Sequence, residues 1–269
     1  MITSASNGRI RHLCELSEKA KSRSSEESFV CEGFRMFEEA PDESIKEIYV
    51  DSDTHKEMEE CFLKTPSNRL GRGFKKLSVL KEKGIDVQEV SGGILKKVSD
   101  TKTPQGIVFV CKMPMYSYED LGSGNLLFLE NIQDPGNLGT MIRTAEGAGA
   151  GGIIMTKGCV DIFNPKVVRA TMGSLFRVPF LYTDHQDEMI RRLKSEGTRI
   201  YAAALSDSIP YTEASYEKRC AFMIGNEGNG LSEQAIDMAD RAIMIPMEGK
   251  LESLNAAVSA AILLYNAKR

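Results

Sequence analysis

The chain has 269 residues, of which 42% are apolar and 27% charged, and its formal net charge is −4. This composition is typical of a globular protein, and the length allows two domains or one large domain. No run approaches the roughly 18 apolar residues of a membrane helix, and the N-terminus lacks the apolar core of a secretory signal.

Cysteine and histidine usage argues against disulfides and metal sites. The six cysteines lie far apart without a CxxC pair, and the three histidines are isolated. A chain of this length does not need disulfides to fold, so we expect reduced thiols and a cytoplasmic protein. We expect no metal ion and no membrane among its partners.

The first part of the chain, residues 1–112, alternates strand and helix patterns. It opens with apolar residues spaced at three and four, which is the period of a helix. The expected strands are Phe29–Gly33, Ile45–Val50, Gly84–Val90 and Ile107–Cys111, and Phe74–Lys83 is an expected helix. This alternation predicts a small α/β domain. Residues 113–124 contain proline and glycines, as a linker does.

The second part, residues 125–269, has longer apolar strands separated by helices. The expected strands are Asn125–Asn131, Gly152–Thr156, Ile200–Leu205, Ala221–Ile224 and Ala242–Ile245. The expected helices are Leu138–Gly149, Asn164–Gly173, Asp184–Glu196 and Leu254–Ala267. Continuous apolar strands alternating with helices predict a mostly parallel sheet that is covered on both faces.

The net charge conceals a strong local contrast. Residues 38–60 carry 10 acidic and 2 basic side chains, whereas residues 64–83 carry 7 basic and 1 acidic. A basic segment can bind phosphates even in an acidic chain, although the alternative of a solvated helix face stays open.

One motif suggests a nucleotide site but has the wrong order. Gly147, Gly149 and Gly152 form a GxGxxG pattern that follows a helix and precedes a strand. A dinucleotide-binding loop leaves a strand and opens a helix, and the C-terminal end of a helix repels phosphate. We therefore interpret these glycines as a helix C-cap, and the alternative of a nicotinamide-dependent oxidoreductase is disfavoured.

The segment after the first strand of the second part carries candidate functional residues. Asp134-Pro135-Gly136-Asn137 is a turn signal, and we expect Asn137 to cap the helix that follows. Arg143 lies six residues further on. Ligands collect at the carboxyl edge of parallel sheets, so Arg143 is a candidate for function, the alternative being a solvated arginine.

Two later segments also follow apolar strands. Ile224–Ser232 holds three glycines and two asparagines, and Ser232 suits a helix N-cap. Glu227, between Asn226 and Gly228, is not explained by packing. In Ile245–Ala257 we expect Ser253 to be an N-cap, and Asn255, at the start of a buried helix, needs hydrogen-bond partners from the backbone or a ligand.

Together and in this order, the three segments resemble the motifs of the SpoU-type RNA 2′-O-methyltransferases of the SPOUT superfamily. The matching stretches are NIQDPGNLGTMIRTAEGAG, IGNEGNGLS and IPMEGKLESLNAAVSAAILLYN. The resemblance covers about residues 125–269, and residues 164–179 are also similar to the family. On Phe29–Gly33 and Thr103–Ile107, the first part is similar to the L30e-like RNA-binding domain of many members.

The resemblance implies an α/β domain with a deep trefoil knot, a homodimer, and S-adenosylmethionine as the cofactor. It implies cofactor contacts, largely through backbone groups, at Gly225, Ile245 and Leu254, with Leu205, Asn226, Met247 and Asn255 beside them. It implies catalytic or substrate-positioning roles for Asn137, Arg143, Glu227, Ser253 and Asn255.

The implied chemistry removes a proton from a ribose 2′-hydroxyl, and no histidine stands in the motifs as a base. Because the pKa of arginine is very high, we expect Arg143 to bind the adjacent phosphate and align the hydroxyl, while the phosphate or a water takes the proton.

We expect ribosomal RNA of the 23S type as the substrate, with transfer RNA second. The alternative is a catalytically inactive RNA-binding or ribosome-associated protein of the same fold. The cations expected to contact RNA are Arg9, Arg11, Lys21, Arg23, Arg69, Arg72, Lys75 and Lys76.

Overall fold

The computed structural model of the chain describes residues 1–99, 101, 103–216 and 218–267. The chain divides into two compact units. Unit 1 comprises Met1–Met115 and Phe163–Phe176, and unit 2 comprises Tyr116–Ile162 and the chain from Arg177 onward. The segment Phe163–Phe176 thus belongs with unit 1 although it lies within the sequence of the second part, which the sequence analysis did not anticipate.

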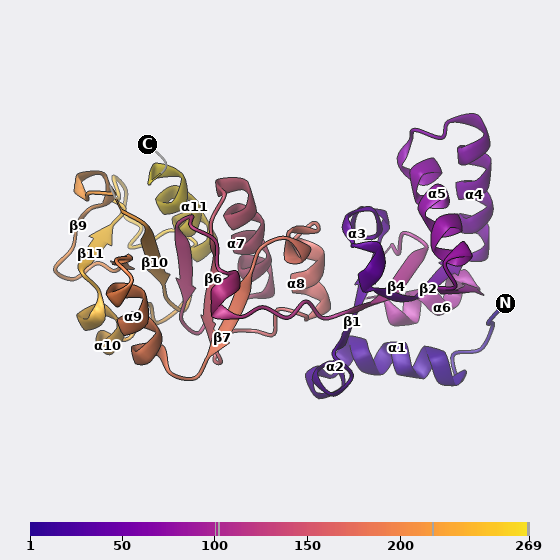
Figure 1. The fold of residues 1–269 in the computed structure, drawn as a ribbon, viewed down its shortest axis with the longest axis horizontal. Coiled ribbons are helices and arrows are strands. Elements are labelled where there is room, and N and C mark those ends of the chain that lie inside the picture. The colour runs from indigo at the N-terminus through magenta and orange to yellow at the C-terminus, as the bar shows by residue number, and fades with distance from the viewer. Residues whose placement is uncertain (100, 102, 217, 268–269) are drawn as a thin grey trace. The chain divides into compact units, whose positions relative to one another are not determined.

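Unit 1 is built around a four-stranded sheet in the order β1-β4-β2-β3. Strands β1, β4 and β2 are labelled in Figure 1. The β1–β4 and β4–β2 pairs are antiparallel, and β2–β3 is parallel. Its strands are β1 (Ser28–Glu32), β2 (Ile45–Asp51), β3 (Asp86–Val90) and β4 (Ile107–Lys112). Its helices are α1 (Gly8–Glu18), α2 (Ala20–Glu26), α3 (Phe34–Glu39), α4 (Ser52–Lys64), α5 (Arg69–Glu82), α6 (Gly92–Val98) and α8 (Pro165–Ala170).

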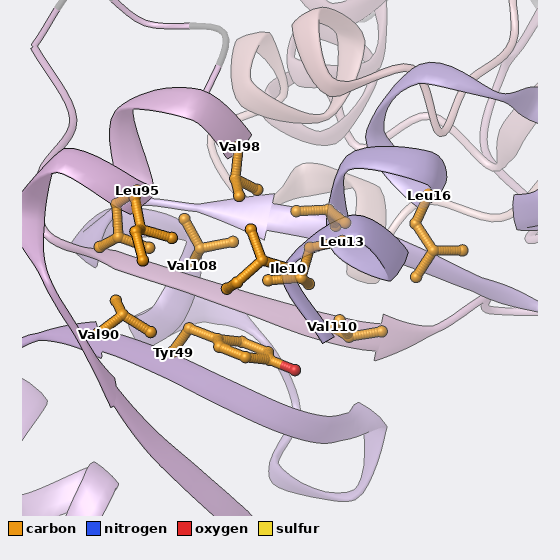
Figure 2. Packing of buried hydrophobic residues seen from close by; sticks show 11 residues of the cluster. Ile10, Leu13, Leu16, Tyr49, Val90, Leu95, Val98, Val108 and Val110 are labelled. Atoms are coloured by element: carbon orange, nitrogen blue, oxygen red, sulfur yellow. The ribbon is translucent and has the colours of Figure 1, made fainter. Parts of the chain in front are cut away.

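Helices α1 and α6 cover one face of this sheet. Ile10, Leu13 and Leu16, at the predicted helical spacing, pack against Val108 and Val110 of β4 (Figure 2). Side chains alternate along a strand, so Phe109 points to the other face. There its ring meets the ring of Phe37 edge-on, with 5.4 Å between the ring centroids. On β1, Phe29 contacts Phe163 at 4.8 Å between ring centroids, which helps to anchor Phe163–Phe176 within unit 1.

Unit 2 contains a seven-stranded sheet in the order β7-β6-β5-β10-β8-β11-β9, and every neighbouring pair is parallel. The strands are β5 (Leu126–Leu129), β6 (Gly152–Thr156), β7 (Phe180–Thr183), β8 (Arg199–Ala203), β9 (Ile209–Pro210), β10 (Cys220–Ile224) and β11 (Arg241–Met244). The helices are α7 (Pro135–Ala148), α9 (Gln186–Ser195), α10 (Glu233–Met238) and α11 (Ala256–Asn266). The predicted α/β fold with a mostly parallel sheet is confirmed.

The two faces of this sheet are covered by different helices. Phe128, Ile154 and Met223 face the cluster that includes residues of α9 and α10. Helices α7 and α11 pack on each other, with α7 also against β6 and α11 against β10 (Figure 1). In the part of the chain that the structure describes, no helix is long and apolar enough to cross a membrane.

The strand order places a switch point between β5 and β10. From β5 the chain proceeds outward through β6 and β7, and it then returns to build β8, β10 and β11 on the other side. In parallel sheets, ligands bind at the carboxyl ends of the strands at such a point. The segments after β5, β8, β10 and β11 all lie at this edge because these strands are parallel.

Two predicted helix caps are wrong by a few residues. Helix α7 begins at Pro135, and the Asp134 side chain, rather than Asn137, caps it by accepting a hydrogen bond from the Asn137 amide at 2.7 Å. Helix α11 begins at Ala256 with Asn255, not Ser253, as its N-cap. Both aspartate before proline and asparagine are strong N-caps, so the path of the chain decides between neighbouring candidates.

Two other predicted caps are confirmed. Ser232 caps α10 by accepting a hydrogen bond from the Ala235 amide at 3.2 Å. Gly149 ends α7 in the left-handed conformation at φ 64°, as the interpretation of the GxGxxG pattern as a C-cap predicts.

Arg23, expected to contact RNA, is instead buried, with 3% of its surface exposed. Its guanidinium donates hydrogen bonds to the backbone carbonyls of Leu16 at 2.7 Å and Ser17 at 2.9 Å. These carbonyls belong to the last turn of α1, which has unpaired carbonyls. Arg23 therefore fixes the corner between α1 and α2, and the expectation that it faces RNA phosphates is corrected.

We predict that Arg23→Ala lowers the free energy of unfolding by about 2–3 kcal/mol, because it leaves buried carbonyls without donors and removes a packed side chain. Lys21→Ala, on the exposed face of the same helix, is the control and should change stability by less than about 0.5 kcal/mol. Urea unfolding followed by circular dichroism measures both. Equal stability of the two variants would contradict the structural role.

Candidate cofactor and catalytic site

An open pocket of about 900 Å³ lies at the carboxyl edge of the sheet in unit 2. Its walls are the segments after β8, β10 and β11, together with the N-terminal ends of α7 and α11. The pocket has the size of small-molecule cofactor sites, which are roughly 300–1,000 Å³ in proteins. It forms where the strand order predicts a ligand site.

The pocket brings together most of the residues that the sequence analysis singled out. Those expected at a cofactor all line it: Leu205, Gly225, Asn226, Ile245, Met247, Leu254 and Asn255. Of the expected catalytic residues, Asn137, Glu227, Ser253 and Asn255 also line it. Asp134 of the predicted turn also lines the pocket, and so do Ala203, Ala204 and Ser206, which were not expected at a site.

Arg143 is not among the residues that line the pocket. It is exposed on α7, six residues beyond Asn137, so the helical period turns it by about 120° away from Asn137. Gly136, Thr140 and Gly147 are exposed on the same helix. Arg143 is thus exposed to solvent on α7, outside the pocket.

The loop after β10 is closed by backbone hydrogen bonds. The Asn226 amide donates to the Gly230 carbonyl at 3.0 Å, and the Gly230 amide donates to the Asn226 carbonyl at 2.9 Å. Because of this closure, a Cβ at Gly225 would lie 2.1 Å from the Gly230 carbonyl carbon. Only glycine fits at position 225, because the returning backbone of Gly230 and Leu231 fills the space of a side chain there, and Gly225 itself lines the pocket.

The Glu227 carboxylate connects this loop to the start of α7. Its Oε2 accepts a hydrogen bond from the Gln133 amide at 3.1 Å, and its Oε1 accepts from the Asp134 amide at 3.0 Å. Oε1 also accepts from Asn137 Nδ2 at 3.0 Å. Partial burial raises the pKa of Glu227, but these hydrogen bonds outweigh it, and the net pKa lies below the ordinary glutamate value.

Asn137 extends the same network to α11. Its Oδ1 accepts a hydrogen bond from Asn255 Nδ2 at 2.8 Å, while Asn255 Oδ1 accepts from the amides of Ala257 and Val258. Three segments far apart in the sequence are thus joined through Glu227, Asn137 and Asn255. Asn255 thus has the hydrogen-bond partners that were expected for it: its Nδ2 contacts Asn137, and its Oδ1 contacts the backbone of α11.

This arrangement assigns chemistry to the pocket residues. An ionised, hydrogen-bonded Glu227 is a weak base, so it orients neighbouring groups rather than taking a proton. Ser253 is exposed at the pocket and makes no hydrogen bond with the described residues, so its hydroxyl is available to a ligand.

The turn after β5 adds a strained residue that the sequence analysis missed. Asn131 adopts a left-handed conformation at φ 55°, and its carbonyl accepts a hydrogen bond from Asn226 Nδ2 at 2.8 Å. Asparagine tolerates this conformation better than other side chains do. The signal available in the sequence was an asparagine directly after an apolar strand.

Several cations of unit 1 expected at RNA are held by carboxylates of the same unit. Glu38 pairs with Arg72 at 2.8 Å and with Arg69 at 3.6 Å. Asp42 pairs with Lys76 at 3.4 Å, and burial lowers the pKa of Lys76 despite this carboxylate. The acidic segment 38–60 therefore neutralises part of the basic segment 64–83.

Of the other cations predicted to contact RNA, one is paired with a described carboxylate and three are not. Arg9 pairs with Asp86. Arg11, Lys21 and Lys75 are exposed and form no salt bridge with any described residue. Within the described ranges, no three His, Cys, Asp or Glu side chains gather as a metal site would require.

Two family models match the chain. Residues 124–265 match the SpoU rRNA Methylase family, and residues 7–108 match the MRM3-like substrate binding domain. Together they cover the sequences of both expected parts.

Among curated proteins, the chain is 35% identical over 268 residues to a Bacillus subtilis (strain 168) protein named 23S rRNA (guanosine(2553)-2′-O)-methyltransferase RlmP, covering 98% of each chain. It is 32% identical to rRNA methyltransferase 3, mitochondrial, of Homo sapiens, over 73% of this chain and 60% of that protein.

Among solved structures, the fold is similar to an AdoMet-bound rRNA methyltransferase from Sinorhizobium meliloti. The TM-score is 0.82 at 29% identity, covering 100% of this chain and 97% of that chain. A structure described as an RNA 2′-O ribose methyltransferase has a TM-score of 0.80 at 29% identity, covering 100% and 98% of the two chains.

We predict that Glu227→Gln destabilises the protein by about 1 kcal/mol at neutral pH, because the amide can replace only part of the hydrogen bonds that the carboxylate accepts. Since folding lowers the pKa of Glu227, this stabilisation is complete above the unfolded pKa of about 4.3 and is lost as the pH falls through the lower folded value. Urea unfolding of wild type and variant from pH 8 to pH 3 measures the difference.

The matched control for this experiment is Glu248→Gln, an exposed glutamate in the segment after β11. It should leave stability unchanged across the pH range. A Glu227→Gln deficit that stays constant down to pH 3 would show that ionisation of this carboxylate contributes nothing.

Proposed function

The chain belongs to the SpoU rRNA methylase family, and from that premise we infer that it is an S-adenosylmethionine-dependent RNA 2′-O-methyltransferase acting on ribosomal RNA. The observation that carries this conclusion is the convergence of the three motif segments on one pocket. The Bacillus subtilis relative, matched over 98% of both chains, is named as a ribosomal RNA 2′-O-methyltransferase. Transfer RNA is the second candidate substrate.

We propose that the cofactor occupies the pocket at the carboxyl edge of unit 2. The backbone at Gly225 and Ile245 offers donors and acceptors to a base edge, and Leu205, Met247 and Leu254 offer apolar surface. When bound, S-adenosylmethionine supplies a methyl group already activated by its sulfonium charge. The protein's task is then mainly to position the ribose hydroxyl against that methyl group.

The side chains around the pocket divide this task. The Glu227–Asn137–Asn255 hydrogen bonds fix the three segments that surround the cofactor. Ser253 presents its hydroxyl at the pocket for a polar group of the cofactor or the RNA. Arg143, exposed on α7, binds the phosphate next to the target ribose through its planar fork and aligns the 2′-hydroxyl. That phosphate or a water accepts the proton.

Unit 1 is proposed as the RNA-binding domain, with an L30e-like fold. The match of residues 7–108 to a substrate binding domain supports this role, as does its mixed four-stranded sheet with helices on its faces. Arg11, Lys21 and Lys75 are its best-placed contacts, since the described carboxylates do not neutralise them. The six free thiols suit a reducing compartment, so we place the enzyme in the cytoplasm.

We also propose that the C-terminal segment forms a deep trefoil knot. In support, β11 lies beyond β8 in the sheet, whereas the next helix, α11, packs on α7 and β10. The intervening residues 245–255 must therefore cross the carboxyl ends of β8 and β10, and Ile245, Met247 and residues 252–255 line the pocket there. A crossing of this kind is what threading through an earlier loop would require.

A homodimer is proposed on the basis of an apolar face on α11. Val258 and Tyr265 are 46% and 51% exposed, and the half-buried Ile262 lies between them at helical spacing. A water-exposed apolar stripe on a helix is typical of an interface with another chain, and a second copy of this chain is the occupant we propose.

We predict that Arg143→Ala reduces methyl transfer by roughly 100-fold or more with little change in cofactor affinity, because Arg143 aligns the RNA and does not line the pocket. Arg143→Lys keeps the charge but loses the fork, and should lose at least about tenfold. The assay is transfer of labelled methyl to ribosomal RNA transcripts, with 2′-O-methyl positions mapped by resistance to alkaline cleavage.

The control is Arg241→Ala, which removes an exposed arginine at the start of β11, at the opposite edge of the sheet. It should retain wild-type turnover. Near-wild-type activity of Arg143→Lys at saturating RNA would refute the aligning role. Wild-type protein that binds ribosomal RNA and the cofactor but methylates nothing would favour the inactive RNA-binding alternative.

We predict that Arg11→Glu, Lys21→Glu and Lys75→Glu together weaken RNA binding by roughly tenfold or more. The slope of the logarithm of the binding constant against the logarithm of the salt concentration should become shallower by up to about 0.7–0.9 for each phosphate contact that is lost. Filter binding across a salt series gives both quantities. Lys56→Glu, an exposed lysine on α4, is the single-charge control. An unchanged salt dependence in the triple variant would exclude these side chains from the RNA interface.

A further inference from the structure

A buried carboxyl group lies next to the site without lining it. Glu130 directly follows β5, only 6% of its surface is exposed, and it is not among the residues that line the pocket. Its backbone amide continues the sheet by donating to the Ile224 carbonyl at 2.9 Å. A buried glutamate needs hydrogen-bond partners, and their identity indicates what the residue does.

Both carboxyl oxygens of Glu130 accept hydrogen bonds from one residue of another segment. Oε2 accepts from the Ser232 amide at 2.7 Å, and Oε1 accepts from the Ser232 hydroxyl at 2.7 Å. The same hydroxyl accepts from the Ala235 amide and so caps α10. Ser232 therefore couples β5 to the first turn of α10.

Ser232 is also the residue at which the pocket loop ends. Residues Gly225–Leu231 leave β10, line the pocket throughout, and enter α10 at Ser232. The tip of this loop is held by Glu227, whose oxygens accept the amides of Gln133 and Asp134. The loop is thus attached to the β5–α7 segment near its start through Asn226, which donates to the Asn131 carbonyl, at its tip through Glu227 and at its exit through Glu130.

The composition of the loop makes such attachment necessary. Three of its seven residues are glycines, which lose the most conformational freedom when a single conformation is imposed. A loop that is ordered only upon binding reduces the apparent affinity by the fraction of molecules in the competent conformation. Attachment at these points, of which Glu130 holds the exit of the loop, lowers that cost before the cofactor arrives.

We propose that Glu130 is a positioning residue for the cofactor: by holding Ser232, it pre-orders the Gly225–Leu231 loop in the conformation that binds S-adenosylmethionine. The inference rests on the proposed function of the pocket. Glu130 does not touch the cofactor and acts only through the loop. Its loss should therefore weaken cofactor binding and loosen the loop amides, without altering the groups that contact RNA.

The test compares Glu130→Ala, Glu130→Gln and wild type as full-length proteins. Titration calorimetry with S-adenosylmethionine should show binding weakened on the order of tenfold for Glu130→Ala and less for Glu130→Gln, whose single carbonyl oxygen can still accept the Ser232 amide. Hydrogen exchange without cofactor should be faster in Glu130→Ala across residues 226–232. Ser232→Ala should add little to the loss of cofactor affinity in Glu130→Ala, because both remove parts of one contact, while its loss of the α10 cap should lower the melting temperature further.

Asp240→Asn provides the matched control for a general loss of stability. Asp240 Oδ2 accepts the Ile200 amide at 2.8 Å, at the amino edge of the same sheet. This variant should lower the melting temperature while leaving cofactor affinity and loop exchange unchanged. Wild-type affinity and loop exchange in Glu130→Ala would overturn the positioning role. Failure of the wild type itself to bind the cofactor would instead overturn the assignment of the pocket.

Discussion

The site depends on one carboxylate that accepts more hydrogen bonds than its own segment can supply. Glu227 accepts backbone amides from the turn before α7 and the side-chain amide of Asn137, which in turn accepts from Asn255 at the start of α11. These contacts hold together the segments that follow β5, β10 and β11. A parallel sheet brings such segments to one edge, but it does not fix their conformations, and here hydrogen bonds between side chains and backbone do so.

This network assigns a structural role to motif residues that were expected to be catalytic. Asn137, Glu227 and Asn255 mainly bind one another, so their first role is to build the pocket. Arg143 is outside that network and exposed, which is consistent with its proposed role in binding RNA. The division is physically reasonable, because a transferable methyl group needs a rigid site around the cofactor, whereas the polymer substrate must enter and leave.

Five of the seven strands of unit 2 were expected from the sequence, because strands such as β5, β6 and β10 are short apolar runs between turn signals. Strands β7 and β9, of four and two residues at the two edges of the sheet, were missed. The helix caps were harder to predict. Asp134 and Asn137, like Ser253 and Asn255, are neighbouring candidates of similar chemistry, and tertiary contacts decide which one caps. Helix α4, rich in acidic residues, was missed because only Met58 is buried on it, so the apolar period that would reveal it is weak.

The basic segment 64–83 suggested a surface free to bind phosphates, but tertiary contacts neutralise several of its cations. The acidic and basic segments of unit 1 are adjacent in the chain, and α3 and α5 also pack on each other in the fold. Glu38 and Asp42 can then neutralise Arg69, Arg72 and Lys76, while burial turns Arg23 into a ligand of backbone carbonyls. A cation is available to a phosphate only if no carboxylate or carbonyl of its own chain holds it. The electrostatic surface of unit 1, the proposed RNA-binding domain, therefore follows from its ion pairs rather than from the order of charges in its sequence.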